Sequence, residues 1–160
     1  TWHSNINSPI IMMTFAEVKA IEAEARFLAA GGSVTSKGAS AEAYAAYMDL
    51  MKANMTKVGV TDAKMNAFLA APEIKVGASN LTLLHIFREK FKANFLVGDI
   101  WTDLRKYNYF DFPMPLNVNP DVAGKRVYRM KYPSSELTRN AKNAEANLKA
   151  PSVNMWLFTK

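Results

Sequence analysis

The sequence predicts an all-α fold that begins with antiparallel helix pairs, the geometry of helical-repeat scaffolds. Two observations predict it: apolar residues recur three or four positions apart in several segments, and residues typical of helix caps bound these segments. No fixed-period sequence repeat accompanies them. The chain has 160 residues, of which 49% are hydrophobic and 21% charged, so it is expected to form one packed globular domain rather than a disordered chain.

The first helix is expected to start at Thr14, because Thr14-Phe15-Ala16-Glu17 has the pattern of a capping box. Met13 and Val18 occupy the positions of a hydrophobic staple, and Gly31-Gly32 ends the helix. The apolar stripe of this amphipathic helix is expected to be Phe15, Val18, Ile21, Ala25 and Leu28.

Two further helices are expected after a polar loop over residues 33–39. Ser40 with Glu42 offers the N-terminal cap of the second helix, and Gly59 its C-terminal cap. The apolar positions of the second helix are Tyr44, Tyr47, Met48, Met51, Met55 and Val58. Thr61 or Asp62 then caps a shorter helix that ends near Ala70, with Met65, Phe68 and Leu69 as its buried side.

The fourth helix, from Leu81 onward, is expected to be central. Its apolar stripe is wider than a surface helix needs and includes Leu83, Leu84, Ile86, Phe87, Phe91, Phe95 and Leu96. Gly98 marks a kink or a break, after which a helical period continues to Asn108.

The sequence after Tyr109 is less regular than the helical part before it. Pro113, Pro115 and Pro120 predict a long irregular segment, and the short stretch 127–132 is expected to be extended. A last helix is expected from Pro133 to about Leu148, followed by an apolar tail that must pack on something.

The charge distribution favours no particular polyanionic partner. The net charge is +6, and all of the surplus lies from Arg88 onward, densest in the group 125–131. A basic patch of this kind is compatible with nucleic acid or an anionic membrane, but most of these residues stand beside acidic neighbours on several helices, so no nucleic-acid partner is expected. The chain has no Cys, which excludes disulfides and thiolate metal sites, and it has no apolar run long enough to span a bilayer. With no signal peptide in the sequence, any export signal is expected upstream or already removed.

No catalytic residue, metal site or cofactor is predicted, and the protein is not expected to be an enzyme. His3 and His85 are the only histidines, and His85 is interpreted as a satisfied helix histidine rather than a metal ligand. Asp99 and Asp103 stand four apart, a spacing compatible with a metal or an acid/base pair, but their basic neighbours suit structural ion pairs better.

Four motifs occur in the order in which the SusD/RagB family has them. The segment 11–25, IMMTFAEVKAIEAEA, resembles the helix "lmtyaEv.fi.AEA" of that family, and 43–60 resembles its "AY...i..sm...gv" helix. The third motif, "L..I..qKy.a.f..g.e.w.DlRR..yp", is matched over 83–113, which includes Lys90, Trp101, Asp103 and Arg105. The fourth, "R..YP..E...N", is matched by Arg129, Tyr132-Pro133, Glu136 and Asn140. Lys106 stands where the family has a second Arg, and the Pro expected after Tyr109 is delayed to Pro113.

The resemblance implies that residues 1–160 are the C-terminal part of a SusD-like nutrient-binding domain whose N-terminal part is absent. It also implies a tetratricopeptide-like helical fold. It implies a lipoprotein on the surface of the outer membrane of Bacteroidetes, held by an N-terminal lipid anchor outside this chain. Such a protein binds an oligosaccharide or polysaccharide, or another nutrient, and delivers it to a SusC-like TonB-dependent transporter. Its motif residues Glu17, Trp101, Asp103, Arg105, Tyr132, Glu136 and Asn140 are expected to be structural.

Glycan binding needs exposed aromatic rings together with planar polar side chains. The candidate ligand-binding residues are therefore Tyr107, Asn108, Tyr109, Phe110 and Trp2, with Trp156 in the tail as a further candidate. The alternative for the segment 107–112 is that its rings plug the end of a helix bundle. The alternative for the whole protein is a helical-repeat scaffold for protein–protein interaction.

Overall fold

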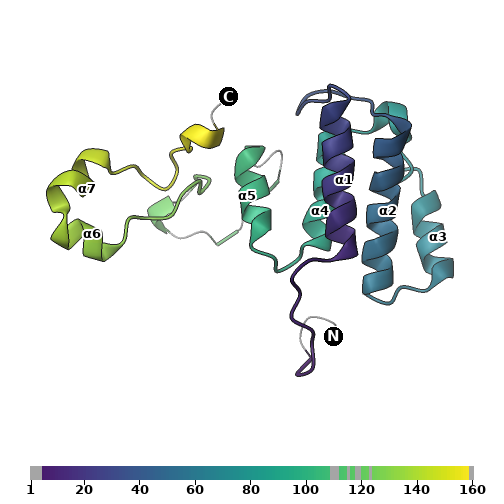
Figure 1. Cartoon of the computed structure of the whole chain (residues 1–160), viewed down its shortest axis with the longest axis horizontal. Coiled ribbons are helices and arrows are strands. Elements are labelled where there is room, and N and C mark those ends of the chain that lie inside the picture. The colour runs from purple at the N-terminus through teal and green to yellow at the C-terminus, as the bar shows by residue number, and fades with distance from the viewer. Residues whose placement is uncertain (1–4, 109–111, 115, 118–119, 123, 159–160) are drawn as a thin grey trace. The chain divides into compact units, whose positions relative to one another are not determined.

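The computed structural model is all helical (Figure 1). It describes residues 5–108, 112–114, 116–117, 120–122 and 124–158, and within these ranges it contains seven α-helices and no strand. The all-α prediction is thereby confirmed. The chain divides into two compact units, residues 1–97 and 98–160, which are described separately below.

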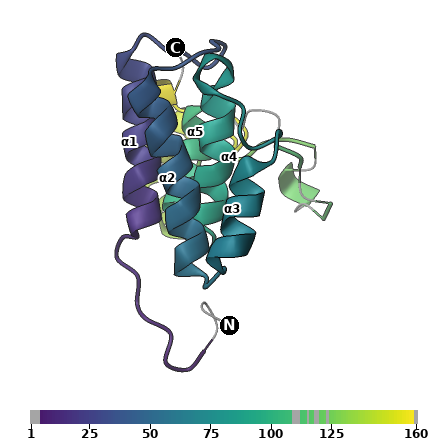
Figure 2. The ribbon, with the colours of Figure 1, turned by 90° about the vertical axis from the view of Figure 1, so that its right-hand side faces the viewer.

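The first unit contains four α-helices and one short 3-10 helix. Its elements are α1 (Phe15–Ala29), α2 (Ala41–Lys57), α3 (Asp62–Ala70), η1 (Ala78–Asn80) and α4 (Leu83–Ala93). Helices α1 and α2 run antiparallel and form the largest helix pair (Figures 1 and 2). Helix α4 packs against both of them, and α3 against α2.

The capping residues act largely as the sequence predicts. The Thr14 hydroxyl accepts a hydrogen bond from the Glu17 N–H at 3.1 Å, and the Ser40 hydroxyl accepts one from Ala43 N–H at 3.2 Å. Gly59 follows α2 with φ of +77°, a conformation that favours glycine at this position. The Glu17 carboxylate does not complete the predicted capping box, because it is turned into the protein, where its Oε1 lies 3.4 Å from Asn94 Nδ2.

The core of the first unit combines small residues of α1 and α2 with larger ones of α4. One cluster joins Ala16 and Ala20 of α1, Leu50 of α2 and Ala93 of α4. Such small side chains let helix backbones approach closely, which suits the tight α1–α2 pair. Buried larger residues on α4 are Leu83, Ile86 and Phe87, so its predicted central position is confirmed.

The stripe predicted for the first helix lies on the wrong side. The buried face of α1 consists of Ala16, Glu17, Ala20, Ala23, Glu24 and Phe27. The predicted stripe of Phe15, Val18, Ile21, Ala25 and Leu28 is solvent-exposed. Both faces repeat with the helical period, and the face of alanines and glutamates is buried because it fits against α2 and α4.

The second unit contains three short α-helices and two 3-10 helices. They are α5 (Asp99–Lys106), η2 (Pro120–Val122), α6 (Ser134–Arg139), α7 (Ala141–Asn147) and η3 (Trp156–Phe158). The expected break near Gly98 is confirmed, since α4 ends at Ala93 and α5 begins at Asp99. The single helix expected from Pro133 to Leu148 is instead two, because Asn140 leaves the helical conformation with φ −132° and ψ 36°.

Arginine side chains rather than a large apolar core organise the second unit. Among its described residues, only Tyr107 and Ala144 are buried hydrophobic residues. Arg129 donates from Nε to Val153 O and from Nη2 to Asn154 O, each at 3.1 Å. The backbone N–H groups of Tyr128 and Arg129 donate to Pro151 O, so the segment 127–129, which forms no strand, is fastened to 151–154.

Candidate functional site

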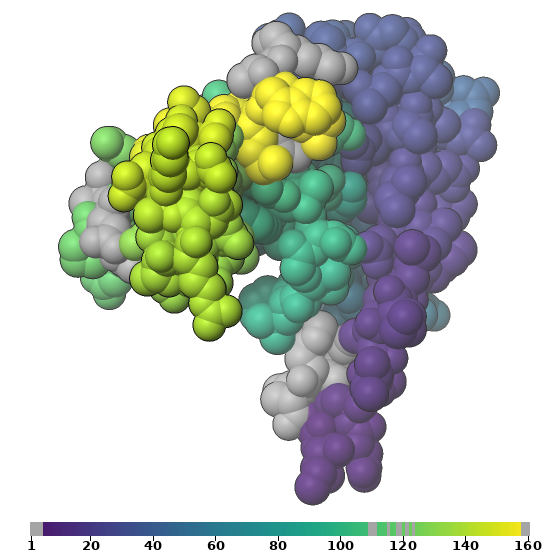
Figure 3. Space-filling view, turned by 60° about the vertical axis from the view of Figure 1, so that its left-hand side comes forward, coloured from purple at the N-terminus to yellow at the C-terminus, as the bar shows by residue number. Residues whose placement is uncertain are grey.

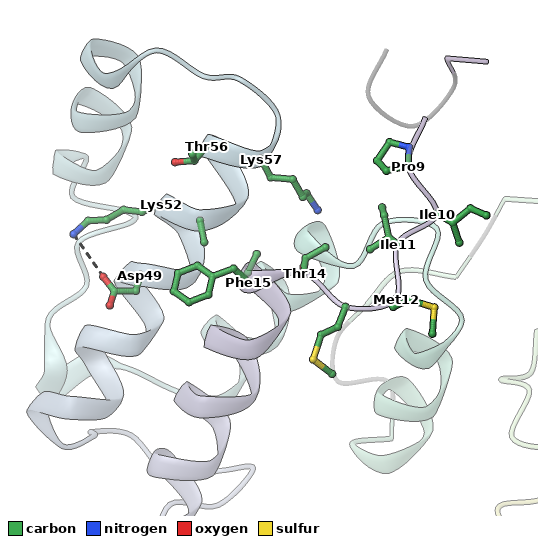
Figure 4. Close-up of a pocket in the computed structure, with 13 residues that line it drawn as sticks. Pro9, Ile10, Ile11, Met12, Thr14, Phe15, Asp49, Lys52, Thr56 and Lys57 are labelled. Atoms are coloured by element: carbon green, nitrogen blue, oxygen red, sulfur yellow. Dashed lines mark ion pairs between the residues drawn. The ribbon is translucent and has the colours of Figure 1, made fainter. Parts of the chain in front are cut away.

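The main candidate site is an open groove of about 850 Å³ in the first unit (Figure 4). One wall is the extended segment 9–13 with the first turn of α1, and the other is the C-terminal half of α2. Figure 3 shows the N-terminal segment, in purple, projecting beyond the start of α1. Figure 4 shows Ile11 turned toward α2, whereas Ile10 and Met12 point away from it.

The walls of the groove are mainly apolar. Ile11 and Met13 are less exposed than Ile10 and Met12, which are above 90% exposed. Phe15, the first residue of α1, is 67% exposed and lines the groove. A groove of this composition suits an apolar group, and Phe15 is the one aromatic residue among the described residues that line it.

Charged groups of α2 line the polar edge of the groove. Asp49 forms ion pairs with Lys52 at 3.7 Å and with Lys19 of α1 at 3.8 Å. Lys57 donates from Nζ to Ala93 O at the C-terminal end of α4, at 2.7 Å. Burial lowers the pKa of Lys57, and the negative charge of Glu17 offsets this only in part. Lys57 thus bonds to the C-terminal end of α4, and Asp49 links α2 to α1 through Lys19.

A buried polar layer lies between α1 and α4. Lys90 Nζ and Glu24 Oε2 form an ion pair at 3.0 Å, and both residues are less than a tenth exposed. Asn94, 2% exposed, donates to Glu17, and its Oδ1 has no hydrogen-bond partner among the residues that the structure describes. These contacts fix the register of the two helices, and their small accessible surface makes them structural rather than ligand-binding groups.

His85 has a structural position at the start of α4. Its Nδ1 accepts a hydrogen bond from Thr82 N–H at 3.2 Å, while the Thr82 hydroxyl accepts from His85 N–H at 3.3 Å. This reciprocal pair is a capping box with histidine in the place usually taken by Glu or Gln. Burial lowers the pKa of His85, and the positive charge of Arg88 lowers it further. No cluster of three or more possible metal ligands occurs among the residues that the structure describes.

The predicted ligand-binding residues fall into two groups. Trp2, Tyr109 and Phe110 lie outside the described residues. Tyr107 is only 7% exposed, and Lys106 Nζ lies 4.8 Å from the centre of its ring, so it presents little surface to a ligand. Asn108 is exposed, has a φ of +51°, and accepts a hydrogen bond from the Tyr128 hydroxyl through Oδ1. A ligand-binding role for these residues remains a prediction.

The motif residues of α5 support the neighbouring loop. Trp101 donates from Nε1 to Val127 O at 3.2 Å, and Arg105 donates from Nη1 to Tyr128 O at 3.2 Å. The Arg105 guanidinium also stacks on the Trp101 ring at 3.9 Å from its centre. Asp103 is half-buried in the same helix. Both side chains donate to backbone carbonyl groups, so they hold the segment 127–128 in place independently of its own side chains.

The motif residues before and after the α6–α7 break are also in contact. Glu136 Oε2 accepts a hydrogen bond from Asn140 Nδ2 at 3.2 Å, and Asn140 Oδ1 accepts one from Asn143 Nδ2 at 2.8 Å. Tyr132 is half-buried just ahead of α6. Trp156, the further candidate in the tail, is 80% exposed.

Sequence reasoning missed the buried polar layer and the cap formed by His85. Glu24 and Lys90 are far apart in the sequence, so their pairing gives no local pattern. The Thr82-x-x-His85 spacing was the available signal for the cap, but the usual capping box has Glu or Gln in the last position.

Comparison with protein-family models, curated proteins and solved structures gives no match to this chain. None of the helices in the described ranges is both long and apolar enough to cross a membrane.

Proposed function

We propose that the chain is the C-terminal part of a SusD-like nutrient-binding protein with a tetratricopeptide-like helical fold. In this proposal the protein lies on the outer surface of the outer membrane, binds glycans or related nutrients without chemical change, and passes them to a SusC-like TonB-dependent transporter. No catalytic residue, metal or cofactor takes part.

The observation that carries the proposal is that residues of separate motifs contact each other. Glu24 of the first motif forms a buried ion pair with Lys90 of the third. Arg105 of the third motif bonds to Tyr128 O, next to Arg129 of the fourth. These motif positions therefore have a physical reason to occur together, which supports the resemblance that suggests the function.

Glycan binding by the native protein tests the proposal. We expect the full-length protein to bind at least one oligosaccharide on a glycan array, and Asn108→Gly to weaken that binding about tenfold. Glycine keeps the positive φ of this position while removing the amide that would bond a sugar hydroxyl. Glycan binding unchanged in Asn108→Gly would remove this residue from the site, and an absence of binding to every glycan and nutrient peptide would contradict the function.

Tyr128→Phe is the matched control for that substitution. It removes the same hydrogen bond to Asn108 Oδ1 but leaves the Asn108 side chain in place. If Asn108 contacts the ligand, the Phe variant keeps most of the affinity. Equal losses in both variants would assign Asn108 to loop structure instead.

A second candidate function is a helical scaffold for protein–protein interaction, favoured by the exposed apolar stripe of α1. Val18, Ile21 and Leu28 are each about 40% exposed or more and follow the spacing that accepts an amphipathic helix. A partner helix captured by the native protein should be lost in Ile21→Glu while glycan binding persists. If Ile21→Glu still captures the partner helix, this face of α1 is not the partner site.

A further inference from the structure

The cap at the start of α4 depends on the protonation state of one side chain. His85 Nδ1 accepts from Thr82 N–H at 3.2 Å, so it must carry a lone pair in this structure. The Thr82 hydroxyl lies 2.9 Å from the same nitrogen. The neutral imidazole therefore serves as the acceptor that satisfies the backbone N–H of the N-cap residue.

Protonation reverses this arrangement. A proton on Nδ1 can be donated to Thr82 Oγ1, but Thr82 N–H then loses its acceptor. The added positive charge also lies at a helix N-terminus, where the helix dipole disfavours cations. Both effects act in the same direction and weaken the first turn of α4.

The cap also fastens a neighbouring loop. Thr82 forms a backbone bridge with Lys37, Gly38 N–H donates to Leu81 O at 2.8 Å, and Ala39 N–H donates to Ala78 O at 2.9 Å. The loop that joins α1 to α2 is thus bonded to residues 78–82, directly before the cap. Loosening the cap removes the anchor for that loop.

We propose that His85 is a pH-sensitive helix cap: the neutral ring holds the first turn of α4 and the 37–39 loop together, and protonation releases them. This inference does not rest on the proposed function.

The charges around His85 set the direction of the effect. On α4 itself, Arg88 opposes protonation and Glu89 favours it, with burial as the largest influence. On the loop side, Lys37 forms a backbone bridge with Thr82, and on α2 the Glu89 carboxylate helps to raise the pKa of Tyr47, after burial. The Glu24–Lys90 pair toward α1 brings one charge of each sign. Burial and Arg88 together leave the pKa of His85 below its usual value.

The sign of the pH dependence follows from that direction. The pKa of His85 is lower in the folded protein than in the unfolded chain, where it is about 6.5. The stabilisation is therefore fully present above about pH 6.5 and is lost as the pH falls through the pKa of the folded state.

Amide hydrogen exchange of the whole chain tests this inference, with rates corrected for their intrinsic pH dependence. At about pH 5.5, well below the usual His pKa, we expect residues 37–39 and 78–86 of the wild type to exchange about fivefold faster than those of His85→Gln. At about pH 7.5 the two proteins should be alike, because Gln forms the same capping box without titrating. An equal ratio at both pH values, or faster exchange spread evenly over α1 and α2, would overturn the proposal.

Titration of the His85 ring by NMR tests the same inference without relying on a variant that must fold. The ring should titrate below about pH 6.5, the usual midpoint of a histidine in an unfolded chain. A His85 midpoint at or above about pH 6.5 would overturn the proposal independently of the exchange data.

Discussion

At the scale of single residues, the Glu24–Lys90 pair is a buried ion pair that joins α1 to α4 in the first unit. Both residues are less than a tenth exposed, and their atoms approach to 3.0 Å between α1 and α4. Removing one partner of a buried pair leaves a charge without compensation, which typically costs about 3 to 5 kcal/mol.

Lys90→Met should therefore lower the free energy of unfolding by about 3 kcal/mol or more, measured by urea denaturation. The double variant Glu24→Leu/Lys90→Met should regain most of that loss, because no charge is then buried alone. As a control, Lys19→Met removes half-buried ion pairs with Glu22 and Asp49 and should cost less than about 1 kcal/mol. If Lys90→Met costs no more than Lys19→Met, the buried pair is not the contact described here.

At the scale of elements, α1 shows what one sequence can and cannot specify. Its start at Thr14 was predictable because a cap is a local hydrogen bond, and this bond is present. Its buried face was not, because Val18 and Ile21 look more like core residues than Ala20 and Ala23 do. The alanine face is buried because its small residues pack closely against α2 and α4. Such packing depends on residues remote in the sequence.

The same distinction explains other results. The cap of Ser40 and the glycine turn at Gly59 are local and were predicted correctly. The α6–α7 break is an exception: its bonds from Asn140 to Glu136 and Asn143 are local, but it was missed because no Gly or Pro, the usual signals of a helix end, occurs there. For the candidate site, the exposed groove beside α1 was missed because its wall comes from a segment with no helical or strand period.

Two substitutions on adjacent positions of α1 test the observed face. Ala20 is 0% exposed and Ile21 is 45% exposed. Ala20→Leu should lower the unfolding free energy by about 1 to 3 kcal/mol through overpacking. Ile21→Glu should change it by about 0.5 kcal/mol or less in this chain, since surface substitutions are usually near neutral. Thermal or chemical denaturation that ranks the two in the opposite order would restore the face expected from the sequence.

At the scale of the whole molecule, the two units differ in what stabilises them. Buried apolar side chains of α1, α2 and α4 form the core of residues 1–97, whereas hydrogen bonds from arginines to backbone carbonyls organise residues 98–160. The second unit is therefore expected to be more sensitive to loss of a single arginine than the first.

Arg105→Lys should accelerate amide exchange several-fold in segments 127–129 and 151–155 while leaving residues 15–93 unchanged. Lysine keeps the positive charge but lacks the planar fork that bonds Tyr128 O and stacks on Trp101. Arg139→Lys, on the exposed side of α6, is the matched control and should have no effect. Uniform acceleration across both units would show that they are stabilised together.

The proposed function is tested most directly by isolating the protein from the outer membranes of its native host after gentle solubilisation. We expect it to be accessible to protease on intact cells and to co-purify with a TonB-dependent transporter in comparable amounts. Recovery of the protein inside the cell, with no transporter bound, would contradict the proposed role in nutrient uptake and favour the helical scaffold.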